Sequence, residues 1–475
     1  MKICKIIIKG FQQFQDTELD FTGPDGQPLN KICLIGQNGT GKSTVLNLVN
    51  GLANGLFGYQ AADLIIVRFK TEDNNEFYHI QSSKLEPATH VFVSTAIDSC
   101  ENWVNEIFQF LAIADHTVIQ NDLLLFIRNN FAKEFLPTGD TVGRVMKELQ
   151  LREEKKELVI FSPAEAEDNH YMRVADCPQT TLNEALALID KFPVHHVVSK
   201  ATVSEMWRTL VYLVKKRESE REIFETRDEN LDLSKRELIE KFEKDNPEIL
   251  HELAEIWNHI LDRANLEFDV EGARKPVQLS ENLEAYIRLK KNGKQHIPYN
   301  RLSTGIRDFL FRLGHIYLLF YNRELRTAFL MVDEPENSLF PDFLFDLMEL
   351  YQKIANPEES PDRTQMFFAT HNPIVAAQFE PHERIILEWQ DDGSVKAHKG
   401  RAPVGDDPND VLRKDFELTS LLGKAGQEKW QRYLELKEWA RHEKNSEKKI
   451  ELIDEALKIG SDYNFPSGIS TSKSQ

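Results

Sequence analysis

The stretch KICLIGQNGTGKST, residues 31–44, decides the fold of this chain. Its apolar start, Ile32 to Ile35, predicts a strand, and the apolar residues spaced along 45–52 predict a helix after the loop. The loop matches the pattern G-x-x-x-x-G-K-[ST], in which glycines let successive backbone N–H groups converge on a phosphate. Lys42 is expected to bridge two phosphate groups, and Ser43 to offer its hydroxyl to Mg²⁺. The predicted nucleotide-binding residues are Gly36, Asn38, Gly39, Thr40, Gly41, Lys42, Ser43 and Thr44.

A second motif, TAFLMVDEPENSLFP at residues 327–341, supplies carboxylates. Its continuous apolar run predicts a strand buried on both faces, with Asp333 at the carboxyl end. There Asp333 can hold Mg²⁺ through water, and Glu334 can polarise an attacking water. Another strand-like run, 365–370, ends at His371, which we interpret as a sensor of the γ-phosphate.

A third segment, RLSTGIRDFLFRLGHIYLLF at residues 301–320, has apolar residues at helical spacing and predicts a helix with one apolar face. Its first turn carries Ser303, Thr304 and Gly305, small residues that leave backbone N–H groups open at the positive end of the helix. Such an end suits an anion, although no lysine or metal-binding acid lies beside it in the sequence.

Together, GQNGTGKST, LSTGIR, LMVDEPENSLFP and FFATHNP resemble the Walker A, signature, Walker B with D-loop, and switch-histidine motifs of the ABC-type ATPases, in the same order. The resemblance implies an ABC-type P-loop NTPase head, a mixed β-sheet flanked by helices, that uses ATP and Mg²⁺. It implies also that the signature of one subunit caps the γ-phosphate held by the P-loop of another. It assigns the signature to Leu302, Ser303, Thr304, Gly305 and Arg307, and the D-loop to Asn337 and Ser338.

Two features help to choose the branch of this family. The signature reads LSTGIR rather than LSGGQ, which points away from transporters and toward RecF, SMC and related ATPases. The segment between the P-loop and the signature is longer than a transporter subunit would use, so a helical insertion is expected. Pro193 and Pro247 interrupt it, and no heptad pattern persists as a long coiled coil requires. The glutamine loop has no clear motif; the turn at residues 162–165 is our best interpretation of its place.

These patterns give a predicted domain organisation. We expect the N-terminal half of the head at 1–165 with a helical segment at about 100–155, a helical insertion at 166–264, the C-terminal half of the head at 265–405, and a helical tail at 406–475. The last residues of the tail, about ten, are expected to be disordered. We predict two hairpins, one in EAYIRLKKNGKQHIPY with an Asn-Gly turn and one in RIILEWQDDGSVKAHK with an Asp-Gly turn.

Composition and charge limit the size of the core, the cellular compartment and the partners that we expect. With 475 residues and 41% hydrophobic composition, the chain can bury a large core. It has no apolar run long enough to span a membrane and does not open on a signal peptide, so we expect a cytoplasmic protein without a membrane partner. The formal net charge of −19 argues against a surface that attracts nucleic acid everywhere.

An acidic ABC-type head with a medium helical insertion and a short helical tail resembles the ATPase subunits of bacterial anti-phage systems. The Septu ATPase family (PtuA), also found as a retron effector, is the most similar, and the PARIS ATPase family is the close alternative; the four motifs do not separate the two, and the tail after residue 400 favours Septu. This resemblance implies a dimer or a larger even-numbered homo-oligomer, such as a hexamer, that controls a partner nuclease. We find no nuclease motif in this chain, so any cutting is expected from the partner. An HNH nuclease is the first expectation for that partner and a Toprim nuclease the next. Contact with nucleic acid is expected through the partner. The alternative is a RecF-like DNA-repair ATPase that clamps DNA on binding ATP.

Overall fold

The structure is a computed structural model of the whole chain. The residues it describes are 1–53, 62–71, 74, 76–86, 90–94, 102–113, 118–131, 158–164, 195–198, 217, 220–230, 232–245, 249–268, 289–291, 295–297, 302–321, 328–337, 339–358, 361, 364–405, 407–416, 418, 420–463 and 465. The chain divides into two compact units, Met1–Asp406 and Asp407–Gln475.

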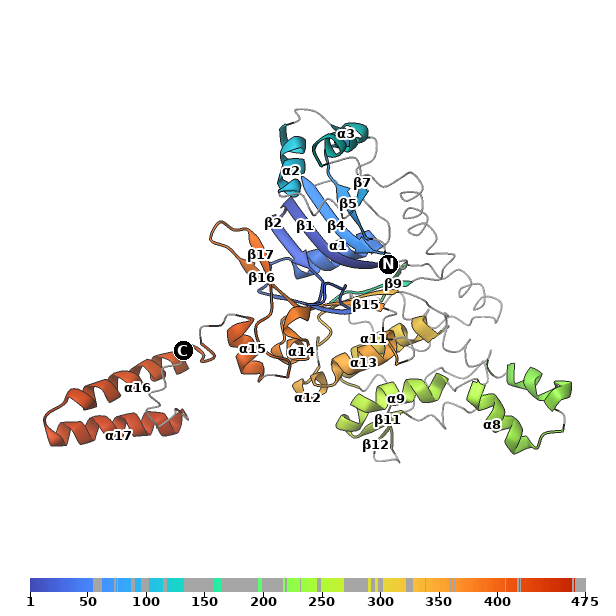
Figure 1. The fold of residues 1–475 in the computed structure, drawn as a ribbon. Coiled ribbons are helices and arrows are strands. Elements are labelled where there is room, and N and C mark those ends of the chain that lie inside the picture. Colours follow the sequence, from blue (N-terminus) through green and yellow to red (C-terminus); the bar gives the residue numbers. More distant parts are fainter. Residues whose placement is uncertain are drawn as a thin grey trace. The chain divides into compact units, whose positions relative to one another are not determined.

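A seven-stranded sheet forms the centre of the first unit (Figure 1). Its order is β10 (His195–Val197), β9 (Leu158–Ser162), β14 (Ala328–Asp333), β15 (Thr364–Thr370), β3 (Lys31–Gly36), β16 (Arg384–Trp389) and β17 (Val395–Lys399). Every neighbouring pair is parallel except the β16–β17 hairpin. With helices on its faces, this sheet confirms the predicted mixed α/β fold of a P-loop NTPase.

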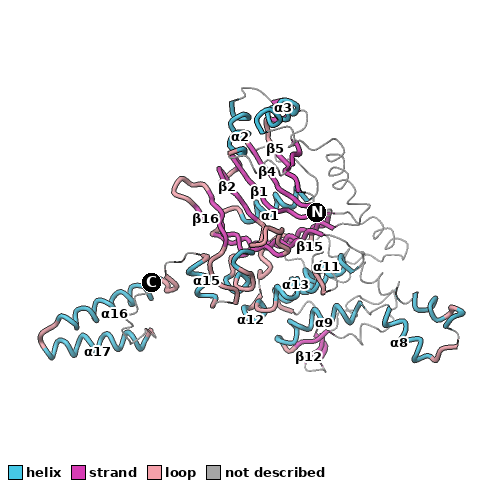
Figure 2. Tube along the Cα trace, viewed as in Figure 1, coloured by secondary structure: helices cyan, strands magenta, loops and turns pink. Residues whose placement is uncertain are grey.

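A second, five-stranded sheet is antiparallel throughout. Its strands are drawn as arrows in Figure 1 and as magenta tubes in Figure 2. Its order is β2 (Phe14–Asp20), β1 (Lys2–Phe11), β4 (Leu64–Lys70), β5 (Glu76–Gln81) and β7 (His90–Ser94). Side chains alternate across β1, so Ile6 and Ile8 enter one core while Ile7 enters another. The sheet therefore has an apolar layer on each face.

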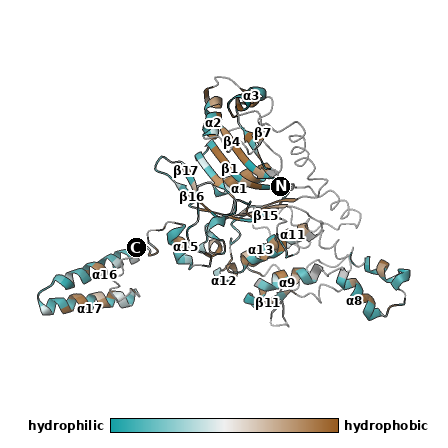
Figure 3. Ribbon diagram, viewed as in Figure 1, coloured by the Kyte–Doolittle hydropathy of each residue, from teal (hydrophilic) through white to brown (hydrophobic). Residues whose placement is uncertain are grey.

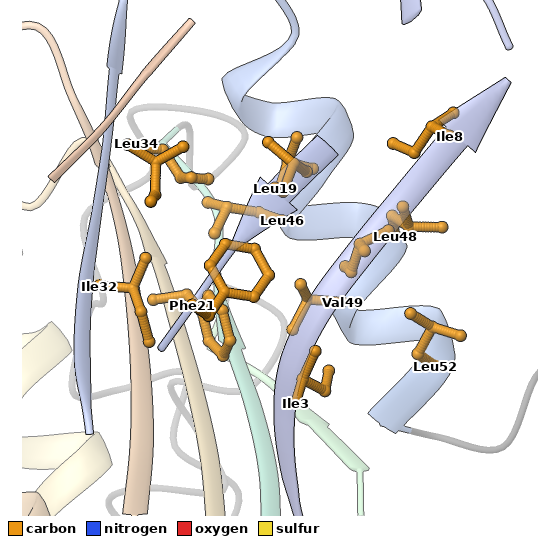
Figure 4. Packing of buried hydrophobic residues seen from close by; sticks show 14 of the residues in the cluster. Ile3, Ile8, Leu19, Phe21, Ile32, Leu34, Leu46, Leu48, Val49 and Leu52 are labelled. Atoms are coloured by element: carbon orange, nitrogen blue, oxygen red, sulfur yellow. The ribbon is translucent and has the colours of Figure 1, made fainter. Parts of the chain in front are cut away.

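Helix α1 (Lys42–Ala53) lies between the two sheets. Its Leu46, Leu48 and Val49 pack among strand residues such as Ile3 of β1 and Ile32 of β3, as Figure 4 shows. On the other face of the antiparallel sheet, α2 (Trp103–Ile113) and α3 (Gln120–Phe131) complete the second core. The helix that follows the P-loop is thus fixed by contacts with both sheets.

The opposite face of the seven-stranded sheet carries α11 (Thr304–Tyr321), α13 (Leu347–Ala355) and α9 (Ile249–Leu261). Phe368 of β15 points to this side and meets Tyr351 of α13 at a ring distance of 5.2 Å, whereas Phe367 belongs to the core around α1. The prediction of one apolar face on the 301–320 helix is wrong, because α11 is buried on all sides from Phe309 to Phe320. Neighbours surround it: Trp257 of α9, for example, donates from Nε1 to the carbonyl oxygen of Leu310 at 3.1 Å.

Smaller elements complete the first unit. They are the paired strands β6 (Leu85–Glu86) and β8 (Val118–Ile119), the antiparallel set β11 (Leu266–Phe268), β12 (Leu289–Lys291) and β13 (Gln295–Ile297), and the helices α8 (Lys235–Asp245), α12 (Pro341–Leu344) and α14 (Pro373–Ala376). Both predicted hairpins are confirmed by the β12–β13 and β16–β17 pairings. Our domain boundaries stay a prediction, with one difference: β10 lies within the expected helical insertion yet pairs with β9 of the central sheet.

The second unit contains α15 (Pro408–Lys414) and a hairpin of two long helices, α16 (Lys424–His442) and α17 (Ser446–Asp462). The hairpin has a small core of Tyr433, Leu436 and Ala456. Most of both helices is hydrophilic, as their teal colour in Figure 3 indicates. Across the described residues of both units, no helix combines the length and the hydropathy that a membrane crossing requires.

Candidate nucleotide-binding site

Three neighbouring parallel strands bring the predicted motifs together. β3 leads into the P-loop, β14 ends at Asp333, and β15, which lies between them, ends just before His371. Because parallel strands end at the same edge of a sheet, groups far apart in the sequence converge there. The most direct contact is a hydrogen bond of 2.7 Å in which Ser43 Oγ donates to Asp333 Oδ2.

The conformation of the P-loop explains its glycines. Gly39 and Gly41 have φ values of +85° and +97°, a region that disfavours side chains. A Cβ on Gly41 would lie 2.5 Å from Cζ of Phe14, so this position has no room for one. Thr40 stabilises the turn by donating from Oγ1 to the carbonyl oxygen of Gln37 at 2.8 Å. The loop is thus built from backbone packed closely between its neighbours.

Lys42 is a buried cation at the mouth of the loop. Its side chain is held over the loop by hydrogen bonds from Nζ to the carbonyl oxygens of Gly36, at 2.8 Å, and Gln37, at 3.3 Å. Burial lowers the pKa of Lys42, and the nearby carboxylates Asp333 and Glu334 oppose that shift. An anion that entered the loop would find this charge already positioned.

Asp333 and Glu334 are adjacent in sequence but differ in surroundings. Asp333 is only 6% exposed, and burial raises its pKa while the hydrogen bond from Ser43 opposes the rise. Glu334 is the residue after the strand and has a φ of +45°, which is uncommon for a side chain of this size. Its backbone is held there by a hydrogen bond of 2.8 Å from its N–H to the carbonyl oxygen of Ala369. The strained backbone directs the Glu334 carboxylate to Nδ1 of His371, at 3.3 Å from Oε1.

Glu336 is a group that our reasoning from sequence missed. It is buried, and its Oε1 accepts hydrogen bonds from Thr370 Oγ1 at 2.5 Å and from the backbone N–H of His371 at 3.3 Å. Burial raises the pKa of Glu336, opposed by these hydrogen bonds. Glu336 therefore ties the turn after β14 to the end of β15 and positions His371. A second acid so soon after DE, in DEPEN, was the available indication.

Arg312 was also missed, although an arginine between Phe311 and Leu313 in an apolar helix is conspicuous. It is buried, and its guanidinium donates to the carbonyl oxygens of Asp333 at 3.2 Å, Glu334 at 3.1 Å and Pro163 at 3.3 Å. Its planar fork of donors suits three acceptors from two different elements. Arg312 thus connects α11 to the ends of β14 and β9.

The predicted signature residues begin α11. Leu302 and Gly305 are buried, whereas Ser303 and Thr304 are exposed. Their hydrogen bonds stay within the first turn: Ser303 Oγ accepts from the N–H of Ile306 at 3.4 Å, and Thr304 Oγ1 from Arg307 at 3.3 Å. Further along the same helix, Arg312 connects α11 to the carbonyl oxygens of Asp333 and Glu334.

Of the predicted D-loop, Asn337 donates from Nδ2 to the carbonyl oxygen of Ala164 at 3.1 Å, and Ser338 lies outside the described residues. The carbonyl groups of Pro163 and Ala164 thus place the turn after β9 beside Arg312 and Asn337. This is the turn in which we expect the glutamine loop, although Glu165 lies outside the described part of the chain.

The site fits a nucleotide with Mg²⁺. Ser43 and Asp333 bond to each other at the edge of the P-loop, and a hydroxyl with a carboxylate is the protein ligand pair that P-loop enzymes offer to Mg²⁺. Within the described residues, no group of three or more His, Cys, Asp or Glu side chains could hold a metal ion. A magnesium ion at this pair would complete its shell with phosphate oxygens and water, as Mg²⁺ usually does.

Comparison with protein families agrees with this geometry. The family model described as AAA ATPase domain matches residues 1–376, a span that runs from β1 past His371. The chain belongs to the AAA ATPase domain family. A comparison with curated proteins gave no match. For an AAA ATPase domain, nucleotide binding is the expected common property, and the groups around Lys42 and Asp333 are the ones that would carry it.

Proposed function

We propose that this protein hydrolyses ATP to ADP and phosphate at the P-loop, with Mg²⁺. The observation that carries the proposal is the convergence of Lys42, Ser43, Asp333, Glu334 and His371 at one edge of the sheet. When bound, Mg²⁺ would neutralise charge on the β- and γ-phosphate oxygens. Lys42 would bind those phosphates, and Ser43 and Asp333 would hold the ion.

Glu334 is the proposed group that orients the attacking water and accepts its proton. A carboxylate suits this role because it is acceptor-only when ionised and is only about a third exposed here, at 33%. His371 lies against its Oε1 and is proposed to contact the γ-phosphate. In this arrangement Lys42 binds the negatively charged phosphates, and Glu334 activates the water.

Hydrolysis is proposed to require a second copy of the chain. The exposed hydroxyl groups of Ser303 and Thr304 lie at the start of the 18-residue helix α11, an end suited to an anion. We propose that they cap the γ-phosphate bound by another subunit, in a dimer or a larger even-numbered assembly.

Complementation tests the shared site. Lys42→Ala should abolish ATP binding, whereas Ser303→Arg should keep ATP binding and remove hydrolysis. A mixture of the two variants should recover part of the activity, because one intact P-loop can meet one intact signature. A mixture as inactive as its components would contradict the shared site, and Ser303→Arg with normal turnover would contradict the role of the signature.

We propose further that the protein is the ATPase subunit of an anti-phage complex of the Septu kind, in which its assembly restrains or licenses a partner nuclease until infection is sensed. Support comes from the resemblance of an acidic ATPase head with a medium helical insertion and a short helical tail to such subunits, and from the net charge of −19, which disfavours direct DNA clamping. Purification together with the products of neighbouring genes tests this setting. Co-elution of an HNH or Toprim nuclease would support it; a bare chain that dimerises only with ATP and DNA would favour a RecF-like clamp.

A further inference from the structure

One aromatic side chain beside the P-loop has no role in the chemistry described above. Trp389 is the last residue of β16, the strand next to β3 on the side away from the catalytic carboxylates. It retains 39% of its surface exposed, whereas the first four residues of β16 are buried. We propose that Trp389 is the platform on which the nucleobase stacks, an inference that rests on the proposed nucleotide binding.

The strand register brings Trp389 to the loop. β16 runs parallel to β3, with Leu387 opposite Gly36, the first residue of the P-loop. Alternate residues of a strand share a face, so Ile385, Leu387 and Trp389 point to the same side. Ile385 and Leu387 enter the core around α1, and Trp389 continues their row beyond the core to the loop itself.

The indole lies against Gly39. A Cβ built on Gly39 would be 3.6 Å from Cζ2 of Trp389, which is van der Waals contact. Gly39 belongs to the loop that is proposed to bind the phosphates. The indole would therefore lie within one nucleotide's length of phosphates held there. No side chain at position 39 stands between the ring and the loop.

The surroundings hold the platform in place. Trp389 pairs with Val395 across the hairpin, and the N–H of Val395 donates to the carbonyl oxygen of Gln13 at 3.0 Å. Gln13 in turn donates from Nε2 to the carbonyl oxygen of Gly39 at 3.3 Å. The hairpin, the turn between β1 and β2, and the P-loop thus form one connected frame around the indole.

A flat aromatic surface determines which ligand features are read. Stacking uses the π-face that every base has and leaves the hydrogen-bonding edge of the base unread. Trp389 is therefore expected to distinguish a nucleotide from a bare polyphosphate, and to contribute little to the choice between adenine and guanine.

The binding of three ligands distinguishes base stacking by Trp389 from structural support of the P-loop. We would titrate the full chain with ATP, GTP and inorganic tripolyphosphate, each with Mg²⁺, by calorimetry. Trp389→Ala should weaken ATP and GTP binding about tenfold, the order expected for one lost base stack, and leave tripolyphosphate binding unchanged. Trp389→Phe should restore most of the loss. Trp439→Ala, which changes an indole 50% exposed in the second unit, is the matched control and should behave as wild type.

Each other outcome overturns the platform. An equal loss for tripolyphosphate would mean that the indole only supports the loop, and no loss for ATP would mean that the base lies elsewhere. A wild-type chain that binds nucleotides no better than tripolyphosphate would reject the platform while leaving the P-loop site intact. Failure of every ligand to bind, with Lys42→Ala indistinguishable from wild type, would reject the proposed function itself. As a second readout, ATP should quench tryptophan fluorescence in wild type and not in Trp389→Phe.

Discussion

At the scale of single residues, Glu334 combines a left-handed backbone with the contact expected of a water-activating group. Glu334→Gln keeps the shape but loses the ability to accept a proton. We expect nearly unchanged ATP affinity and a turnover lower by about 10²- to 10⁴-fold, the usual contribution of a general base. Steady-state phosphate release and ATP titration measure the two quantities.

Glu438→Gln provides the control for that variant, because Glu438 is an exposed glutamate of α16. It should leave both turnover and affinity as in wild type. A Glu334→Gln protein with wild-type turnover would assign water activation to another group.

Glu336 gives a prediction about pH. Burial raises its pKa above the unfolded value, so the folded state binds this proton more tightly than the unfolded state does. The stability from this group is fully present below the unfolded pKa and is lost as pH rises through the folded pKa. Glu336→Gln removes the titration while keeping an acceptor for Thr370. Its free energy of unfolding should therefore fall less than that of wild type as pH rises from about 4, which urea titrations at several pH values would measure.

If wild type and Glu336→Gln keep a constant difference in unfolding free energy from pH 4 to pH 7, the buried carboxylate is not responsible. Glu438→Gln again serves for comparison, since its side chain is exposed.

At the scale of elements, Arg312 connects helix α11 to the end of strand β14. Arg312→Lys keeps the charge but cannot satisfy three carbonyl oxygens on two elements. We expect a loss of about 1–3 kcal/mol of unfolding free energy, because buried acceptors lose their partner, together with a lower turnover. Urea unfolding and phosphate release would measure these effects.

Arg236→Lys is the matched control, because Arg236 on α8 is 88% exposed and bonds only across one helical turn. A loss of stability in Arg312→Lys without any change in turnover would limit Arg312 to a structural role.

Elements that carry a recognisable sequence motif could be predicted from the sequence. The strand–loop–helix around Lys42, the apolar strand before Asp333 and the two hairpins follow from local patterns, and the structure has all of them. What could not be predicted depends on sheet order. β15 lies between β3 and β14, and this order brings His371 to Glu334. It depends on the pairing of β15 with β3, two strands far apart in the sequence, which no local pattern encodes.

The same limit explains the residues that were missed. Arg312 and Glu336 have their partners on other elements, so their roles appear only once those elements are packed together. The burial of α11 from Phe309 to Phe320 likewise depends on its neighbours, which include α9 and α13.

At the scale of the whole molecule, the two compact units differ in the size of their cores. The α16–α17 hairpin relies on a few side chains, among them Leu436, which is fully buried. Leu436→Ala should destabilise the hairpin by about 2–5 kcal/mol, a typical cost of such a truncation, and leave ATP affinity unchanged. Thermal unfolding followed by circular dichroism, with ATP titration, would test both parts.

Leu434 on the same helix is 47% exposed, so Leu434→Ala controls for helix propensity and should have little effect. If Leu436→Ala weakened ATP binding, the two units would be coupled in stability.

The position of β3 has a consequence for the order of events during synthesis. β1, β2, β4 and β5 pair with near neighbours in sequence and can form a sheet soon after they leave the ribosome. β3 is made early too, but both strands that flank it, β15 and β16, come from residues after 363. β3 and the P-loop that follows it therefore lack both flanking strands until most of the chain has been translated. Chains that terminate before β15 and β16 are made should be unable to capture ATP, so nucleotide binding also marks a chain whose central sheet has closed around β3.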